Sequence, residues 1–406
     1  MSAAPLYGLR VVDFGQGVAG PYCGQLLADH GADVIKVEPP RGDWSRTLGA
    51  EGGVFFSVNR NKRGLCLDLR DGEACVAARE LALAADVVVE SFRPGVMERL
   101  GLGAIALRAE RPELVYCSVT GFGPDGPNVD LPAGDSIMQA YGGLMSIVGE
   151  RDGPPLRVGN VVSDMVAGTN AFAGVLLALI ARQRSGQGQH VRVSLLDSIV
   201  AFQAPPLSEF LLTGSAPRRI GNDHPLIAPS GTFRASDGAL TLTVFDHRWP
   251  AFCAGMGKHE WLEDARFASS ELRQRHRDDL NATLAPLLLS RPRNEWLAEL
   301  RRIDVPCAPV NEYPDLVADA QVRHNGLIGA LQDGSGRSVP DIRGAIQLEA
   351  PTPLSRAAPQ LGEHTREVLR DLTGWTPERL TALFVRGAAI QLEAGIPSNP
   401  TPSLGR

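Results

Sequence analysis

The sequence predicts an α/β fold built on a parallel, doubly wound sheet, followed by a smaller α+β domain. In residues 1–200, short runs of β-branched and other apolar residues alternate with stretches of helical spacing. Strands that alternate with helices in this way form βαβ units, in which the strands lie parallel. Glycine- and proline-rich turns follow several of these runs, where an open α/β sheet binds its ligands.

The elements of the large domain can be placed along residues 1–200. Strands are expected at 9–14, 33–38, 65–69, 86–91, 114–119 and 190–197, and helices up to about residue 30, over 73–85 and over about 164–184. Residues 201–224 contain prolines and are expected to form a polar connection.

A change of pattern after this connection predicts a small domain over 225–325. It begins with a β-hairpin whose turn is Ser236-Asp237-Gly238, and two or three helices follow to about residue 304. The segment VPCAPVN is expected to lead back to the large domain, which residues 330–406 complete with one helix in GEHTREVLRDL and a poorly structured end.

Composition narrows the class of protein. The 406 residues are 44% hydrophobic and 21% charged, which is typical of a globular protein, and the net charge of -6 argues against a nucleic-acid binder or a partner of anionic membranes. Six cysteines occur singly, without metal-ligand spacing, so we expect a reduced cytoplasmic protein with no bound metal. The longest apolar run, VLLALIA, is too short to span a bilayer and is expected to be a buried helix.

The most specific local pattern is a glycine-rich turn. Gly15, Gly17 and Gly20 satisfy G-x-G-x-x-G, and Glu38 ends the next apolar run where a ribose-binding acid would lie. Pro21 and the basic segment PPRGDWSR after Glu38 weaken a nicotinamide or flavin interpretation. The pattern alone is equally compatible with a simple strand-to-helix turn.

Basic residues gather around the ends of successive predicted strands. A cluster of this kind suits a ligand with several phosphates, which arginine binds in a bidentate manner. Ion pairs with nearby acids are the alternative for each residue taken singly. The cluster comprises Arg41, Arg46, Arg60, Lys62, Arg63, Arg70, Arg93 and Arg99.

Several segments in order resemble the class III coenzyme A transferases, the CaiB/BaiF family, which includes α-methylacyl-CoA racemases. They include LRVVDFGQGVAGPYCGQLLADHGADVIKVEPPRGD, NRNKRGLCLDL, ADVVVESFRPGVMERLGL, LVYCSVTGFGPDGP, GNVVSDMVAGT, GNDHP and LGEHTREVL. The resemblance implies a Rossmann-like large domain, a small domain and a homodimer of two interlinked, ring-shaped chains. It also implies acyl-CoA and a small carboxylic acid as substrates, with no tightly bound cofactor.

The resemblance further implies which residues contact coenzyme A. Gln16, Gly17, Val18 and Ala19 match a segment that lies against its pantetheine and phosphates. Ser91 stands where asparagine is frequent, which leaves one adenine contact open, and Phe92 could stack on adenine or pack in the core. The positions that match the nucleotide end are Arg41, Leu67, Arg70, Ser91, Phe92 and Arg99.

Asp164 matches the nucleophile of these transferases. From its neighbours alone it reads as the N-cap of a long apolar helix, and the helix N-terminus is expected to lower its pKa and keep it ionised. Attack on an acyl-CoA would give a mixed anhydride and then an aspartyl-CoA thioester. Backbone amides of Gln16–Val18 or of the turn Gly121–Gly123 are candidates for the oxyanion donors.

One position separates transferase from racemase. Racemases of this family carry a histidine where this chain has Gly134, next to Asp135, so a two-base racemase would lack one base. We therefore expect a transferase, with the racemase as the alternative and His224 as a possible substitute base. His224, in GNDHP, is equally compatible with substrate positioning and with loop stabilisation.

Overall fold

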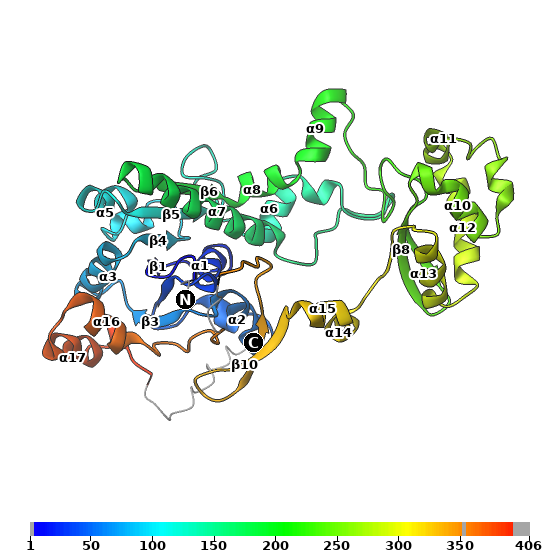
Figure 1. Ribbon diagram of the computed structural model, residues 1–406. Coiled ribbons are helices and arrows are strands. Elements are labelled where there is room, and N and C mark those ends of the chain that lie inside the picture. The colour runs from blue at the N-terminus through cyan, green and yellow to red at the C-terminus, as the bar shows by residue number, and fades with distance from the viewer. Residues whose placement is uncertain (1–3, 351–354, 393–406) are drawn as a thin grey trace, which may run out of the picture. The chain divides into compact units, whose positions relative to one another are not determined.

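The structure is a computed structural model that describes residues 4–350 and 355–392, and it divides the chain into two compact units (Figure 1). The first unit comprises residues 1–144, 157–212 and 323–406, and the second comprises residues 145–156 and 213–322. The chain thus enters the second unit twice, the first time well before the predicted small domain at 225–325. The predicted poorly structured end, from about 395 on, lies outside the described residues.

A seven-stranded, mostly parallel sheet forms the centre of the first unit. Its strand order is β12-β3-β2-β1-β4-β5-β6, and only β12 runs antiparallel to its neighbour. Because the order reverses between β1 and β4, the carboxyl ends of these two strands diverge and leave a crevice. The strands are β1 (Arg10–Asp13), β2 (Asp33–Glu38), β3 (Arg63–Leu67), β4 (Val87–Glu90), β5 (Val115–Thr120), β6 (His190–Ser194) and β12 (Ala389–Ile390).

Helices of the first unit cover the sheet and carry the ligand-facing turns. They are α1 (Ala19–Asp29), α2 (Gly53–Asn59), α3 (Gly72–Ala84), α4 (Val96–Arg99), α5 (Ala104–Glu110), α6 (Asp135–Tyr141), α7 (Val162–Ser185), α8 (Leu195–Phe202), α9 (Ala204–Thr213), α16 (Thr365–Thr373) and α17 (Pro377–Val385). A hairpin of β10 (Ile328–Gln332) and β11 (Ser338–Ile342) also belongs to this unit.

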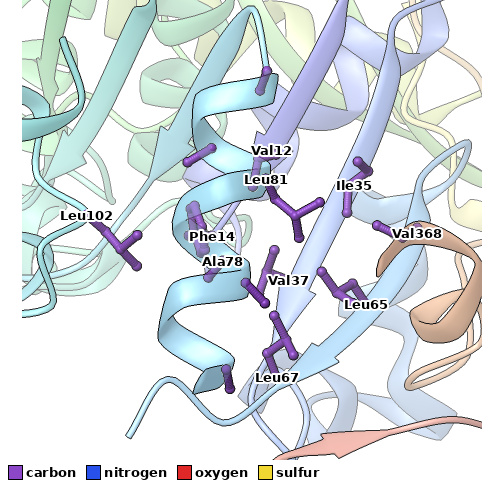
Figure 2. Packing of buried hydrophobic residues seen from close by; sticks show 14 of the residues in the cluster. Val12, Phe14, Ile35, Val37, Leu65, Leu67, Ala78, Leu81, Leu102 and Val368 are labelled. Atoms are coloured by element: carbon purple, nitrogen blue, oxygen red, sulfur yellow. The ribbon is translucent and has the colours of Figure 1, made fainter. Parts of the chain in front are cut away.

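The core on one face of the sheet is built from small and branched apolar residues. Side chains of β1, β2 and β3 point toward α3, and Val368 of α16 reaches the same cluster (Figure 2). Alanines dominate the buried face of α3, so this helix can lie close to the strands. The C-terminal helices therefore complete the large domain's core, far in sequence from the strands they cover.

Two stretches differ from the sequence-based expectation. Residues 190–197 were predicted as one strand, but the strand ends at Ser194, whose hydroxyl accepts from the Asp197 amide and caps α8. The predicted connection at 201–224 is wrong for its first half, which forms α9. Its prolines lie in the first turn, where the missing amide hydrogens cost no helical hydrogen bond.

The second unit is a small α+β unit. The predicted hairpin is present as β7 (Ser230–Ala235) and β8 (Gly238–Thr243), and β9 (Cys307–Pro309), within VPCAPVN, pairs with β8. Four helices follow or flank the hairpin rather than two or three: α10 (Trp249–Gly255), α11 (Ser270–Arg275), α12 (Arg277–Leu289) and α13 (Arg293–Arg302). The short helices α14 (Tyr313–Ala318) and α15 (Ala320–Asn325) lead back to the first unit.

Helix α7 is long and apolar enough, by length and composition, to cross a membrane, and 39% of its most apolar window is buried. It packs against α1, α8, β5 and β6 within the first unit. The prediction that 175–181 is a buried helix is therefore wrong for one of its faces: Val175, Ala178 and Leu179 are buried, whereas Leu177 and Ile180 are 67% and 49% exposed.

Candidate active site

Two adjoining pockets lie at the carboxyl ends of the strands in the first unit. The large pocket, of about 1070 Å³, is lined by the glycine-rich turn after β1, the turns after β4 and β5, the start of α6 and the start of α7. The side pocket, of about 500 Å³, extends over the ends of β2 and β3. Gln16 and Phe92 line both pockets, so a long ligand can occupy the two together.

Most of the predicted contact residues lie at these pockets. Those that line the large pocket are Gln16, Val18, Ala19, Ser91, Phe92, Gly121, Gly134 and Asp164. Those that line the side pocket are Gln16, Arg41, Leu67, Arg70, Phe92 and Arg99. Gly17 and Gly123 line neither pocket.

The conformation of the glycine-rich turn explains its glycines. Gly17 has φ +79°, a left-handed conformation that favours glycine, and a Cβ there would come within 2.2 Å of the Trp44 ring. Gly20 lies close to Ser91, whose Cβ would be 3.0 Å from an added Cβ. Because these glycines have no side chain, the start of α1 can pack closely against the segment that follows β4.

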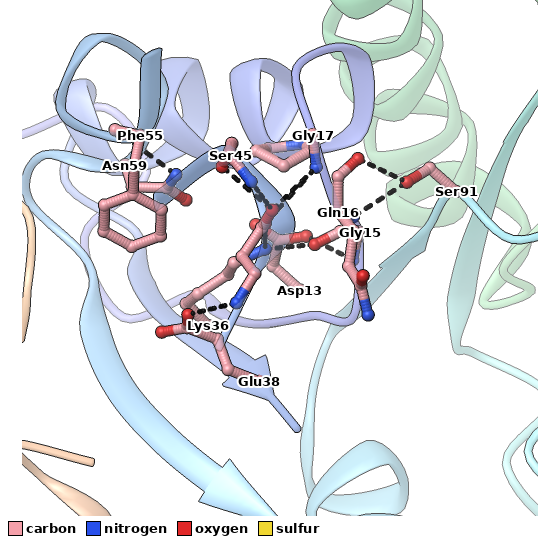
Figure 3. A network of polar contacts seen from close by, with 12 residues as sticks. Asp13, Gly15, Gln16, Gly17, Lys36, Glu38, Ser45, Phe55, Asn59 and Ser91 are labelled. Carbon is pink, nitrogen blue, oxygen red and sulfur yellow. Dashed lines mark hydrogen bonds and ion pairs between the residues drawn. The ribbon is translucent and has the colours of Figure 1, made fainter. Parts of the chain in front are cut away.

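Side chains from three directions hold the backbone of this turn (Figure 3). Asp13 accepts from the Gly15 amide at 2.8 Å, and Asp43 accepts from the Gly17 amide at 3.1 Å. The Ser91 hydroxyl accepts from the Gln16 amide at 2.9 Å and donates to the Gln16 carbonyl. Ser91 thus binds the turn itself and lines the large pocket; its expected contact with the nucleotide end of the ligand stays a prediction.

Two fully buried ion pairs lie beneath the turn. Lys36 lies 2.8 Å from Asp43, and Lys62 lies 2.8 Å from Asp13. Burial favours a lower pKa for Lys36, but the carboxylates of Asp13, Asp43 and Glu38 outweigh it and leave the pKa raised. For Lys62, burial prevails and lowers the pKa to about 8. This network was not predicted, although a lysine inside the apolar strand DVIKVE is a signal for a buried charge with a partner.

Glu38 has no free oxygen for a ribose. Its buried carboxylate accepts from Arg46 through both oxygens, each at 2.7 Å, and from the Asp43 amide at 2.9 Å. The acid that would bind the nucleotide ribose in a nicotinamide enzyme is therefore already occupied. This removes the main support for the dinucleotide interpretation of the glycine pattern.

The predicted basic cluster divides into paired and unpaired residues. Arg60 pairs with buried Asp29, Arg63 pairs with Asp33 and Glu367, and Arg46 and Lys62 are occupied as described above. Arg70 pairs with Asp68 at the surface. Within residues 4–350 and 355–392, no hydrogen bond or ion pair is formed by the side chains of Arg41, Arg93 or Arg99.

The turn after β4 is held by an acid. Glu90 is buried at the end of the strand, accepts from the Phe92 amide at 2.8 Å, and has its pKa raised to about 7 by burial. Phe92 is partly buried against the α3 core and still lines both pockets. Both predicted roles of Phe92, core packing and ligand contact, are thus sterically compatible.

Asp164 occupies the third position of α7 rather than its N-cap. The N-cap is Val161, which has no side chain able to cap the helix. Burial, together with the negative charge of Asp135, raises the pKa of Asp164 to about 7. The expected lowering by the helix N-terminus is therefore wrong, because desolvation and a like charge outweigh it. None of the described residues donates a hydrogen bond to this carboxyl group.

Asp135 fixes the start of α7 from the neighbouring helix. Its carboxylate accepts from the Ser163 amide at 2.8 Å, from the Ser163 hydroxyl at 2.6 Å and from Gln139 at 2.7 Å. These bonds join α6 to α7 directly beside Asp164. Asp135 is the first residue of α6, and its bonds to Ser163 arise only from the tertiary structure.

A glycine in α7 brings Asp164 close to the glycine-rich turn. A Cβ on Gly168 would lie 2.7 Å from the Ala19 carbonyl oxygen and 3.0 Å from the Tyr22 ring. Gly168 is one helical turn after Asp164 and on the same face of α7. Asp164 therefore lies on the face of α7 that packs against α1, and it lines the large pocket together with Val18 and Ala19.

The amides of the turn differ in whether they are free to bind a ligand. Those of Gly15, Gln16 and Gly17 are bonded to Asp13, Ser91 and Asp43. In the described part of the chain, the amides of Val18 and Ala19 have no acceptor, and both residues line the large pocket.

Gly134 and His224 bear on the choice between transferase and racemase. An added Cβ at Gly134 would meet nothing within 4 Å, so a larger side chain would fit there, but the chain has none. His224 belongs to the second unit, where its ring accepts from the Leu226 amide at 3.1 Å and its carbonyl accepts from Arg277. These contacts are those of a loop-stabilising residue.

Comparison with known proteins decides the family. The model of CoA-transferase family III matches residues 6–365. The chain belongs to this family. CoA-transferases act on CoA thioesters, so the large pocket and the side pocket are the candidate binding sites for a thioester.

Named relatives cover nearly the whole chain. It is 37% identical over 382 residues to the succinate–glutarate CoA-transferase of Agrobacterium fabrum, covering 91% of this chain and 96% of that protein. It is 35% identical to the succinyl-CoA–D-citramalate CoA-transferase of Chloroflexus aurantiacus, covering 93% and 96%. Among solved structures, a CaiB/BaiF family protein from Brucella suis has a TM-score of 0.83 and 36% identity, covering 92% of this chain and 100% of that one.

Proposed function

We propose that this enzyme moves coenzyme A from an acyl-CoA to a small dicarboxylic acid, with Asp164 as the nucleophile. The observation that carries the proposal is the position of Asp164. Its carboxyl group accepts no hydrogen bond from the described residues, and it lines the large pocket together with residues of the glycine-rich turn. A carboxyl group with a perturbed pKa that lines a pocket of this size is typical of a catalytic group.

The side pocket suits the nucleotide end of coenzyme A. Arg41 and Arg99 are basic residues that line it without forming an ion pair to any described acid, and Phe92 lies where the two pockets meet. Unpaired arginines bind phosphates strongly. The strand order 3-2-1-4-5-6 supports the Rossmann-like description, in which such ligands lie at the switch between β1 and β4.

The reaction divides into balanced exchanges at one carboxylate. An Asp164 oxygen forms a bond to the thioester carbonyl carbon, the carbon–sulfur bond breaks, and a mixed anhydride and the CoA thiolate result. The thiolate then attacks the aspartyl carbonyl, releases the donor carboxylate and leaves an aspartyl-CoA thioester. The acceptor carboxylate repeats the two exchanges in the opposite order.

Each tetrahedral intermediate carries an oxyanion that needs donors. The amides of Val18 and Ala19 are candidates, since they line the pocket with Asp164 and are not bonded elsewhere in the described chain. Gln16 and Gly17, which the sequence analysis included, already donate their amides to Ser91 and Asp43. Gly121 also lines the pocket, at the turn after β5.

A dicarboxylic acceptor is favoured by the relatives and by two arginines. The names of the relatives include succinate, glutarate, D-citramalate, mesaconate and oxalate. Arg93 and Arg157 line the large pocket and form no ion pair to a described acid. Either guanidinium could bind the carboxylate that does not react.

The racemase alternative is not favoured. The named relatives are CoA-transferases, and the position of the second base is Gly134. The family resemblance also leads us to propose a homodimer in the cytoplasm. Exposed apolar side chains on α7, α8 and α9, among them Leu177, Phe202, Leu211 and Leu212, would suit such an interface.

The test of the proposed function is covalent labelling. We expect incubation with succinyl-CoA or glutaryl-CoA, followed by trapping with hydroxylamine, to modify the peptide that contains Asp164. Asp164→Asn should abolish the modification and transferase activity while leaving free CoA bound. An unlabelled Asp164, together with exchange of the α-proton of a 2-methylacyl-CoA in deuterated water, would instead support the racemase.

A further inference from the structure

The buried pair of Lys36 and Asp43 contacts both ends of the Gly15–Gly17 turn. The Lys36 ammonium donates to the Gly15 carbonyl and to Asp43. Asp43 accepts from the Gly17 amide at 3.1 and 3.3 Å and from the Ser45 amide at 2.9 Å. One ion pair therefore fixes a carbonyl and an amide only two residues apart.

Stability alone does not explain a fully buried ion pair at this place. Removing two charges from water costs several kcal/mol, and apolar residues of similar volume often stabilise a protein as well or better. Both side chains are inaccessible to solvent. The pair must therefore supply something that apolar packing would not, namely hydrogen bonds to specific backbone groups.

The backbone of the turn needs such a hold. Glycine adopts left- and right-handed conformations with similar ease, so a turn with Gly15 and Gly17 has no intrinsic preference strong enough to fix its peptide planes. Val18 and Ala19 follow directly, and the direction of their amides depends on the conformation of Gly17, whose φ is +79°.

We propose that Lys36 and Asp43 are positioning residues for acyl transfer: they fix the Gly15–Gly17 turn so that the Val18 and Ala19 amides point into the pocket that holds Asp164. The inference rests on the proposed function of that pocket. Neither side chain lines the large pocket, so the pair acts through the turn rather than on the substrate. The pair should therefore control the rate of acyl transfer more than the binding of coenzyme A.

The experiment compares Asp43→Asn with a control on the same strand as Lys36. The amide side chain would keep the size of the aspartate and lose the charge that faces Lys36. We expect kcat for transfer to fall by about 100-fold, the loss typical of a misplaced oxyanion donor, with little change in the dissociation constant of free CoA. Deuterium exchange at residues 14–20, measured by mass spectrometry, should become faster.

The control is Asp33→Asn, at the other end of β2. Asp33 accepts from Arg63 at 2.9 and 2.6 Å, so its loss also breaks an ion pair of this strand, but far along the strand from the turn. We expect lower stability to denaturant, an unchanged kcat and unchanged exchange at residues 14–20.

The double variant Lys36→Met/Asp43→Leu separates positioning from stability. We expect it to resist denaturant at least as well as Asp43→Asn and to remain slow in acyl transfer. A wild-type kcat in Asp43→Asn or in the folded double variant would overturn the proposal, as would unchanged exchange at residues 14–20. If wild-type Asp164 were never acylated, the proposed function would fail, while the exchange measurement would still decide whether the pair holds the turn.

Discussion

Asp164 is an acid whose environment opposes its ionisation. It is half-buried, Asp135 lies nearby, and its pKa is raised to about 7. The folded protein keeps this proton to a higher pH than the unfolded chain does. The free energy of unfolding therefore decreases as the pH rises from about 4, the pKa in the unfolded chain, to about 7, the pKa in the folded protein. Nucleophilic attack requires the ionised carboxylate. The same rise in pH that lowers the free energy of unfolding therefore increases the fraction of Asp164 that can attack.

At this scale we predict a pH-dependent nucleophile. The rate of Asp164 acylation should rise with pH and level off above about 7, because only the ionised carboxyl group attacks. Asp135→Asn should move the midpoint to lower pH, since it removes the like charge that contributes to the raised pKa. Rapid-quench labelling across about pH 4.5–9 measures both profiles; a wild-type midpoint near the ordinary aspartate pKa of about 4 would contradict the expectation.

Between elements, the contact of α1 with α7 determines how near Asp164, the proposed nucleophile, comes to the glycine-rich turn. Gly168 permits this contact, because any Cβ there would press on the Ala19 carbonyl oxygen. The sequence shows Gly168 only as a poor helix former within an apolar helix, which is a cost of about 1 kcal/mol relative to alanine. The close contact with the Ala19 carbonyl oxygen explains why glycine occupies this position despite its low helix propensity.

We therefore predict that Gly168→Ala lowers the rate of acyl transfer by at least about tenfold, as displacements near reacting groups do. Helix propensity alone predicts that Gly168→Ala stabilises the protein and leaves acyl transfer unchanged. A slower transfer would therefore indicate that the close contact of α1 with α7 requires glycine at this position. The matched control is Gly72→Ala in the first turn of α3, where an added Cβ meets nothing within 4 Å. Steady-state kinetics of both variants measure the difference; equal kcat values would show that the approach of α1 to α7 does not matter.

For the whole molecule, the proposed homodimer can be tested through α9. None of the residues of α9 is buried within the chain, and Leu211 and Leu212 are 73% and 86% exposed. Leucines with that exposure on one helix are unusual on a monomer's surface and suit a protein interface.

We expect sedimentation equilibrium to give twice the mass of one chain. Leu211→Glu/Leu212→Glu should weaken the association, because it places charges in an apolar interface. Arg370→Glu, a surface change on α16, is the charge control and should leave the mass unchanged. A monomeric wild-type protein would exclude the proposed homodimer.

Much of this protein follows from its sequence. Apolar runs with strand spacing and the helical stretches between them predict the parallel sheet, because burial on both faces selects for such patterns. The order of several motifs predicted the family, which the comparison confirmed. Most of the residues expected at the ligand line two adjoining pockets, since the carboxyl ends of parallel strands meet at one edge of the sheet; Gly17, Gly123 and His224 do not.

Other properties depend on contacts between residues far apart in the chain. The sequence could not show that Glu38 is occupied by Arg46, that Ser91 holds the Gln16 backbone, or that Asp135 fixes the start of α7. It also predicted a lowered pKa for Asp164, because helix position is a local property whereas desolvation is not. Patterns along the chain are enough to predict the fold class, the family and the acid that we propose as nucleophile. Which charges pair, which amides lack an acceptor in the described chain and how easily that acid ionises depend on contacts and burial that arise when distant segments pack together.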